Sequence, residues 1–269
     1  MNGSKETVMQ RLHQDIETVS SMGYKVFGVF LQGSQNYNLD YEGSDIDTKC
    51  IVLPTMEDVI LNRKPVSTTH INPDNTHTDI KDIRLMWECF KKQNINFLEI
   101  LFTDCYVVKG LRYKAEWKRM EDAAEDIAHF NNYAAVNCIA GMVFEKNAAL
   151  CHPYPTLKDK IEKHGYDNKQ LHHILRCAEF LDRYIEGVPY EECLIPTNPQ
   201  QLIDVKASYI YSLDEAKQIA KETVDTVKAV KERYMNENLV CINTRAEKIM
   251  QSVLVDILKQ SFLEDLDVI

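Results

Sequence analysis

The sequence predicts an α+β fold for its first part and an all-α arrangement for the rest. In the first 110 residues, short apolar runs rich in β-branched and aromatic residues alternate with amphipathic helical patterns. From about Leu111 onward the sequence changes to long helical patterns. A chain of 269 residues with 45% apolar content can form two domains of ordinary size, and we expect them at 1–110 and 111–269.

The first predicted helix runs from Glu6 to Met22 and ends before a glycine. Its apolar residues recur at helical spacing: Val8, Leu12, Ile16 and Val19. Residues 24–32 (YKVFGVFLQ) and 46–54 (IDTKCIVLP) have the composition of buried strands. A polar stretch therefore connects two strands.

Two further short strands are expected within residues 66–80, joined by a turn at residues 72–75. Asp82 is expected to cap the next helix. Residues 95–108 are compatible with a helix, a strand, or one followed by the other. Four long helical patterns cover residues 124–150, 168–187, 212–235 and 244–264, and residues 188–208, rich in Pro, Asn and Gln, are expected to be loop-like.

Composition excludes several classes of protein. The formal charge of −10 argues against broad, non-specific binding to nucleic acid. No apolar run approaches the roughly 20 residues that span a bilayer, and no signal peptide is visible, so we expect no membrane partner and a cytoplasmic protein. The eight cysteines contain no C-x-x-C pair, which suits a reducing compartment.

The polar stretch within LQGSQNYNLDYEGSDIDTKCIVLP, residues 31–54, carries the strongest functional signal. Side chains two residues apart on a strand share a face, so Asp45 and Asp47 would lie side by side. Their repulsion is relieved when a divalent cation lies between them, and Mg²⁺ prefers such oxygen ligands together with phosphate oxygens. The alternative is a polar turn with solvated carboxylates.

Gly33 and Ser34 precede the two aspartates by ten intervening residues. A glycine after a strand allows the backbone to approach a phosphate closely, and a serine adds a hydroxyl and an N–H group. The combination of strand, Gly-Ser, ten residues, Asp-x-Asp and strand favours a site in which Gly33 and Ser34 hold a triphosphate while the aspartates hold its metal ion.

This stretch resembles the signature of the DNA polymerase β-type nucleotidyltransferase superfamily. The resemblance implies a polymerase β-like core, a small mixed sheet with flanking helices, and transfer of a nucleoside monophosphate from an NTP with the help of two Mg²⁺ or Mn²⁺ ions. It also implies a third carboxylate on a neighbouring strand. Asp79 is the preferred candidate, and Asp82 and Glu99 are the alternatives.

The helical pattern of residues 165–187 places Lys169, His173 and Arg176 on one face. They would either be solvated or contact the triphosphate or the acceptor, where an arginine can grip phosphate with two N–H groups. The stretch YDNKQLHHILRCAEFL is similar to a helix of the predicted nucleotidyltransferase family of bacteria and large phages, and the match covers roughly residues 25–235. That family commonly has Asn-Pro before its Leu-Glu, whereas this chain has Asn94-Ile95-Asn96.

The sequence therefore predicts a metal-dependent nucleotidyltransferase whose acceptor is a hydroxyl of RNA, of a protein or of a small molecule. If the chain is phage-encoded, the resemblance implies the host cytoplasm. The alternative from another class is a catalytically silent nucleotide-binding or antitoxin-like interaction protein. Both aspartates and the Gly-Ser pair are present, which favours the enzyme.

Overall fold

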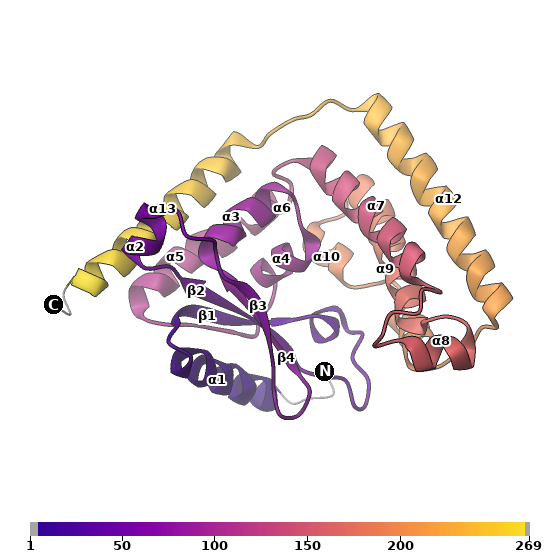
Figure 1. The fold of residues 1–269 in the computed structure, drawn as a ribbon. Coiled ribbons are helices and arrows are strands. Elements are labelled where there is room, and N and C mark those ends of the chain that lie inside the picture. The colour runs from indigo at the N-terminus through magenta and orange to yellow at the C-terminus, as the bar shows by residue number, and fades with distance from the viewer. Residues whose placement is uncertain (1–4, 267–269) are drawn as a thin grey trace. The chain divides into compact units, whose positions relative to one another are not determined.

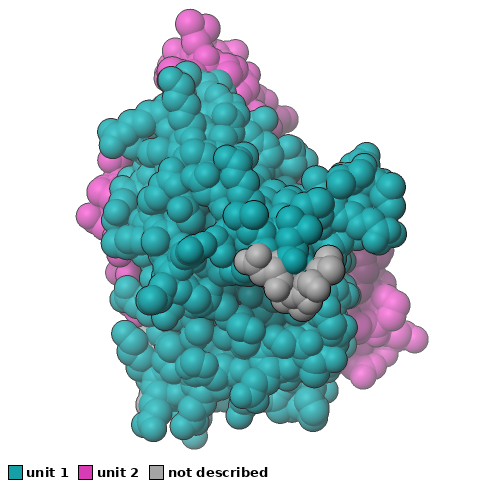
Figure 2. All heavy atoms as spheres, turned by 90° about the vertical axis from the view of Figure 1, so that its left-hand side faces the viewer, with its two compact units in different colours: residues 1–36, 42–130, 242–269 teal, residues 37–41, 131–241 magenta. Residues whose placement is uncertain are grey.

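The computed structural model describes residues 5–266 (Figure 1). The chain forms two compact units, shown in teal and magenta in Figure 2. Unit 1 holds the described residues of 1–36, 42–130 and 242–269, and unit 2 holds residues 37–41 and 131–241. The boundary expected near residue 110 falls inside unit 1. The reason is that helices α5 (Leu111–Glu121), α6 (Ala124–Ala128) and α13 (Thr244–Leu266) belong to that unit.

Unit 1 is built on a mixed sheet of five strands in the order β3-β4-β2-β1-β5. Strand β1 (Lys25–Gln32) pairs antiparallel with β2 (Asp47–Leu53), and β2 pairs parallel with β4 (His77–Asp82). Strands β3 (Ser67–Ile71) and β5 (Tyr106–Val108) form the two edges, each antiparallel to its neighbour. The α+β prediction for this part of the chain is confirmed.

Helix α1 (Lys5–Ser21) covers one face of the sheet. Its buried stripe, with Leu12 at the centre, packs on a cluster that includes Val29 and Cys50. The pairing of β1 with β2 shifts register between Val26 and Gly28. At Gly28 an added Cβ would lie 2.9 Å from the Val107 carbonyl oxygen of β5, so only glycine allows this close approach of the strands.

The opposite face is covered by helices from distant parts of the sequence. Helix α3 (Ile83–Lys91) follows β4 directly, and the predicted N-cap is confirmed because the Asp82 carboxylate accepts the Arg84 N–H at 2.9 Å. Trp117 of α5 packs on Phe30 of β1, with ring centroids 4.6 Å apart. Helix α13 lies along α5, as Figure 1 shows. Unit 1 also contains α2 (Met56–Ile60), α4 (Ile95–Leu98) and the short 3₁₀ helix η2 (Glu99–Leu101).

Unit 2 is helical apart from residues 38–41 and its connecting loops. Helix α9 (Asn168–Ile185) packs on α7 (Asn132–Ala149), α11 (Pro199–Ala207) and α12 (Leu213–Glu237), and α8 (Lys158–His164) and α10 (Tyr190–Leu194) complete the unit. The expectation of a loop-like segment at 188–208 was wrong, since α10 and α11 lie there. Its Pro and Asn residues start helices: Asn198 caps α11 and Pro199 occupies its first turn.

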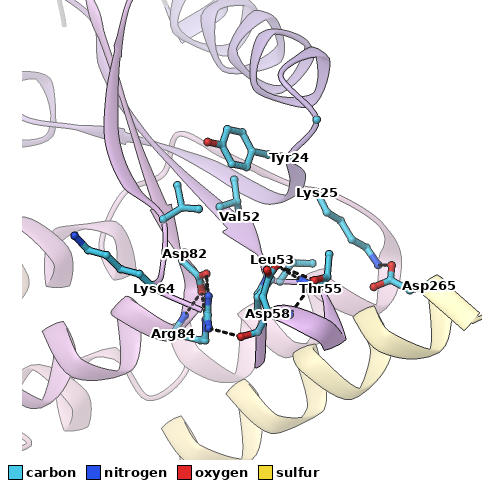
Figure 3. A pocket seen from close by; sticks show the side chains of 13 residues that line it. Tyr24, Lys25, Val52, Leu53, Thr55, Asp58, Lys64, Asp82, Arg84 and Asp265 are labelled. Carbon is cyan, nitrogen blue, oxygen red and sulfur yellow. Dashed lines mark hydrogen bonds and ion pairs between the residues drawn. The ribbon is translucent and has the colours of Figure 1, made fainter. Parts of the chain in front are cut away.

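A pocket of about 400 Å³ in unit 1 lies where β1 begins and β2 ends (Figure 3). Residues Gly23, Lys25, Leu53 and Asp82 are among those lining it. Gly33 follows the opposite end of β1, so the pocket is separated from the Gly-Ser and Asp-x-Asp motifs by the length of the strands, roughly 20 Å. Two of its three basic residues are paired with carboxylates: Lys25 with Asp265 at 2.8 Å, and Arg84 with Asp82 at 2.6 Å.

Within residues 5–266, no helix is both long and apolar enough to cross a membrane.

Candidate active site

The Gly-Ser pair forms a tight turn at the end of β1. Gly33 has a φ of +83°, a conformation that favours glycine, and Ser34 begins the 3₁₀ helix η1 (Ser34–Tyr37). The side chain of Asn36 fixes the turn, because it donates to the Leu31 carbonyl oxygen at 2.9 Å and accepts from the Thr103 hydroxyl at 2.8 Å. The turn is therefore held on both sides by unit 1.

Asp45 and Asp47 lie at the beginning of β2, beside this turn. Gln32 pairs with Asp47, and the Gln35 side-chain amide donates to the Asp45 carbonyl oxygen at 3.3 Å. Asp45 precedes the strand, whereas the sequence placed both aspartates on it. The reason is that β1 ends at Gln32 and offers Asp45 no partner. The Asp45 side chain is exposed and that of Asp47 is half-buried.

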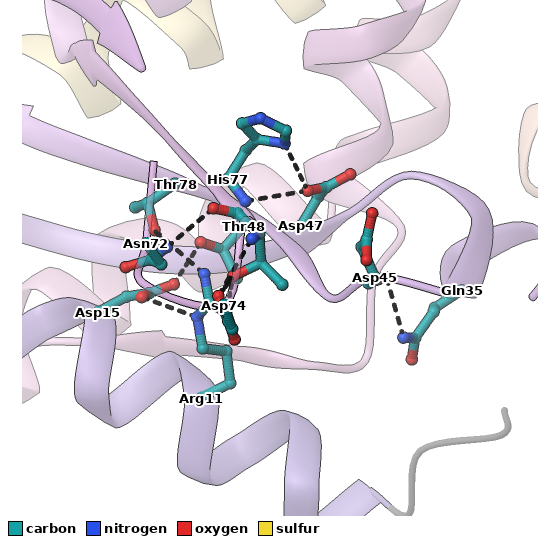
Figure 4. A network of polar contacts seen from close by, with 11 residues as sticks. Arg11, Asp15, Gln35, Asp45, Asp47, Thr48, Asn72, Asp74, His77 and Thr78 are labelled. Atoms are coloured by element: carbon teal, nitrogen blue, oxygen red, sulfur yellow. Dashed lines mark hydrogen bonds and ion pairs between the residues drawn. The ribbon is translucent and has the colours of Figure 1, made fainter. Parts of the chain in front are cut away.

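His77, at the start of β4, is the immediate neighbour of Asp47. Its backbone N–H donates to the Asp47 carboxylate at 3.2 Å, and its Nδ1 lies 3.5 Å from the same oxygen (Figure 4). This contact follows from the parallel register, in which Thr48 lies opposite Thr78. His77 was not singled out in the sequence analysis. Its position near the start of a predicted strand, like that of Asp47, indicated that the two residues could meet at one edge of the sheet.

Asp79 lies on β4, two residues after His77, and is paired with Lys49 rather than with Asp47. Its carboxylate is 3.1 Å from the Lys49 ammonium and 2.8 Å from the Lys81 ammonium, and it accepts from the Thr69 hydroxyl at 3.2 Å. Burial raises the pKa of Asp79, but the two lysines outweigh it and hold the pKa below its usual value. Asp79 is therefore an ionised partner of two lysines.

The two alternative carboxylates occupy different places. Glu99 is buried, and its carboxylate accepts the Gly33 N–H at 3.1 Å, which brings it to the Gly-Ser turn. Asp82 caps α3 and pairs with Arg84 at the far end of the sheet, beside the pocket described above. Of the two, Glu99 is the one near the predicted phosphate-binding turn.

A buried polar network on the α1 side supports the start of β2 (Figure 4). Arg11 Nε lies 2.8 Å from the Asp15 carboxylate, which also accepts the Thr48 hydroxyl. The Arg11 guanidinium reaches the hydroxyls of Thr76 and Thr78 in the β3–β4 region. The network joins α1 to the strand residues on either side of the Asp47–His77 contact. The sequence feature that indicates this network is the i,i+4 pair Arg11 and Asp15, which lies within the apolar stripe of the first helix.

Within unit 2, the three predicted basic residues of α9 have different environments. Lys169 is exposed. Burial, followed by the nearby Arg176, lowers the pKa of His173 well below its usual value, so His173 is neutral. Arg176 is buried, and its guanidinium lies over the Tyr37 ring at 4.3 Å. The three residues therefore do not form one solvated cationic stripe.

The chemistry available in unit 1 is that of hard oxygen ligands. Among residues 5–266, no group of three or more His, Cys, Asp and Glu side chains is arranged to hold a metal ion. Asp45 and Asp47 supply two carboxylates at one end of the sheet, and Mg²⁺ is commonly held by one or two carboxylates with water and substrate phosphates completing its shell. The pair fits that donor set.

Comparisons with protein-family models and with curated proteins found no match. Among solved structures, one similar chain is a nucleotidyltransferase-like protein from Exiguobacterium sibiricum 255-15. The identity is 8%, the alignment covers 96% of this chain and 91% of that chain, and the TM-score is 0.33. A similarity of this size does not identify a function for this chain.

Proposed function

We propose that the protein is a nucleotidyltransferase that uses Mg²⁺ or Mn²⁺ to move a nucleoside monophosphate from an NTP to a hydroxyl acceptor. The main support is the proximity of the two motifs. Gln32 pairs with Asp47, and Gln35 donates to the Asp45 carbonyl oxygen at 3.3 Å, so the Gly-Ser turn and the two aspartates are neighbours despite the ten residues between them.

In this proposal Asp45 and Asp47 hold the divalent cation, which would neutralise charge on the phosphates and stabilise the leaving pyrophosphate. Ser34 would donate hydrogen bonds from its hydroxyl and its N–H to the triphosphate. Gly33 allows the tight turn that orients these two groups. The Gly33 N–H donates to Glu99 in this structure. A phosphate oxygen would therefore replace the Glu99 carboxylate at that group.

The reaction balances without a redox partner. The acceptor oxygen forms a bond to the α-phosphorus, and the bond from that phosphorus to the oxygen bridging it to the β-phosphorus breaks. Pyrophosphate leaves with that electron pair, and the hydroxyl proton passes to water. Such a transfer needs positioning and charge neutralisation more than covalent help from the protein.

The acceptor would be an RNA end, a protein hydroxyl or a small molecule. The net charge of −10 favours the last two, because an acidic surface repels a polyanion. The role proposed for Lys169, His173 and Arg176 is contact with the triphosphate or the acceptor. His173 is neutral, so in that role it would contribute a hydrogen bond, and the positive charge would come from the other two.

The test is transfer of label from each of the four α-³²P-labelled NTPs, with Mg²⁺ or Mn²⁺, to total RNA or to a cell lysate that is then fractionated. The inactive control carries Asp45→Asn and Asp47→Asn. The matched control is Glu42→Gln, which removes an exposed carboxylate from the same stretch of chain. We expect transfer by the wild type and by Glu42→Gln, and none by the double variant.

The fraction that carries the label identifies the acceptor class. The same low signal from the wild type and the double variant, with every NTP and both metals, would count against an enzyme and favour a silent nucleotide-binding protein. Circular dichroism of each variant checks that loss of transfer does not follow from loss of folding.

A further inference from the structure

Lys49 is a buried lysine on the same strand and the same face as Asp47, two residues further along β2. Its side chain is 4% exposed, and its ammonium lies 3.1 Å from the Asp79 carboxylate. The ammonium also lies 4.7 Å from the centre of the Phe97 ring, which comes from α4. A buried ammonium requires such partners, because leaving it unpaired away from water is costly.

The partner of Lys49 is the residue that sequence reasoning assigned to the metal. One oxygen of Asp79 faces Lys49, and the other faces Lys81 and the Thr69 hydroxyl. If the Asp79 oxygen that faces Lys49 turned to a cation beside Asp47, Lys49 would be buried without its counter-ion.

We infer that Asp79 is the counter-ion that fixes Lys49, and that Lys49 supplies fixed positive charge beside a single divalent cation held by Asp45 and Asp47. Lys49 is thus a positioning residue. Its positive charge helps to neutralise the phosphates, a task that would otherwise need a second cation held by a third carboxylate. This inference rests on the proposed function, and it replaces the two cations and the ligand role of Asp79 that the resemblance implied.

The geometry makes the effect of Lys49 measurable. Two residues along a strand separate the Cα atoms of Asp47 and Lys49 by roughly 6.6 Å, and the two side chains leave the same face of the sheet. A positive charge at a separation of this order weakens the binding of a cation, so removing Lys49 should tighten Mn²⁺ binding about tenfold in a partly solvated site. Lys81 also pairs with Asp79, but it lies further along the sheet from Asp47, opposite Ile51. Removing Lys81 should have a smaller effect.

The decisive variant replaces both members of the ion pair, Lys49→Met with Asp79→Asn. This exchange leaves the net charge unchanged and uses side chains of similar size, which a buried pair commonly tolerates. Binding of Mn²⁺ alone, followed by electron paramagnetic resonance, should show one ion per chain in the wild type and in the double variant, with dissociation constants within about threefold.

A dissociation constant more than about threefold weaker in the double variant, or two ions per wild-type chain, would overturn the inference, because either result would make Asp79 a ligand. Asp47→Asn tests the proposed function separately and should lose Mn²⁺ binding. If Asp47→Asn binds Mn²⁺ as tightly as the wild type, the metal site itself is misassigned, and the inference falls with it. Circular dichroism of each variant verifies folding.

Discussion

The ion pair between Arg11 and Asp15 ties helix α1 to the strand that carries Asp47, and it gives a quantitative prediction for the variant Asp15→Ala. The two side chains are 9% and 3% exposed, and Arg11 Nε lies 2.8 Å from the Asp15 carboxylate. Thr48, the residue after Asp47, donates its hydroxyl to the same carboxylate. Removing Asp15 leaves a buried guanidinium without its main partner.

Breaking a buried ion pair by removing one member typically costs about 3–5 kcal/mol. Arg11 retains a weaker ion pair with Asp74 at 3.5 Å, and the Asp74 side chain is 63% exposed. That contact offsets part of the loss, so we expect the lower end, about 3 kcal/mol of unfolding free energy. In a domain of this size the midpoint of thermal unfolding should fall by roughly 6–12 °C.

Urea unfolding followed by circular dichroism measures the change. The matched control is Glu17→Ala, which removes an exposed carboxylate from the same helix and should change the unfolding free energy by less than about 0.5 kcal/mol. The double variant Arg11→Met with Asp15→Leu removes the charge together with its partner and should cost less than Asp15→Ala alone. A loss below about 1 kcal/mol for Asp15→Ala, or a larger loss for the double variant, would refute the reasoning.

Three further predictions concern stability. Gly28→Ala places a Cβ 2.9 Å from a carbonyl oxygen of β5 and should cost about 1–3 kcal/mol, whereas Gly141→Ala, in open space on α7, should stabilise; equal urea midpoints would contradict this. Burial lowers the pKa of His172 to about 3, below the ordinary 6.5. Below pH 6.5 the unfolded chain therefore binds a proton that the folded chain does not, and stability falls toward pH 3 by up to about 1.4 kcal/mol per pH unit. His172→Asn should reduce that slope, and an unchanged slope between pH 6 and 4 would argue against a buried neutral His172. Asp82→Ala removes the cap of α3 and the partner of Arg84 and should cost about 2 kcal/mol, measured by urea unfolding; a loss under 0.5 kcal/mol would make the cap unimportant.

The sequence was sufficient for features that depend on local pattern. The strands on either side of the Gly-Ser turn have continuous β-branched and aromatic runs, and both formed as predicted. The Asp82 cap also formed, because a cap depends on the two or three residues that follow it. Residues 95–108, left open between helix and strand, form helix first and strand β5 last.

The sequence was insufficient where partners come from distant parts of the chain. Helix α13 packs with α5 in unit 1 although more than 100 residues separate them, and helical periodicity does not identify the partner of an apolar face. The register of β4 on β2 decides that His77 meets Asp47 and that Asp79 meets Lys49. A shift of two residues would place Asp79 opposite Asp47, and Lys81 opposite Lys49, without altering either strand's pattern, so the sequence could not distinguish the two registers.

The measurement that tests the central claim most directly follows the α-phosphate and the γ-phosphate of one NTP. The wild-type protein is incubated with Mn²⁺, the lysate fraction and an NTP that is labelled in parallel reactions at the α- or the γ-phosphate. We expect the α-label in the acceptor and the γ-label in pyrophosphate, in equal amounts, with both lost in Asp45→Asn plus Asp47→Asn. The γ-label in the acceptor, or equal transfer by the double variant, would contradict nucleotidyl transfer at these two aspartates.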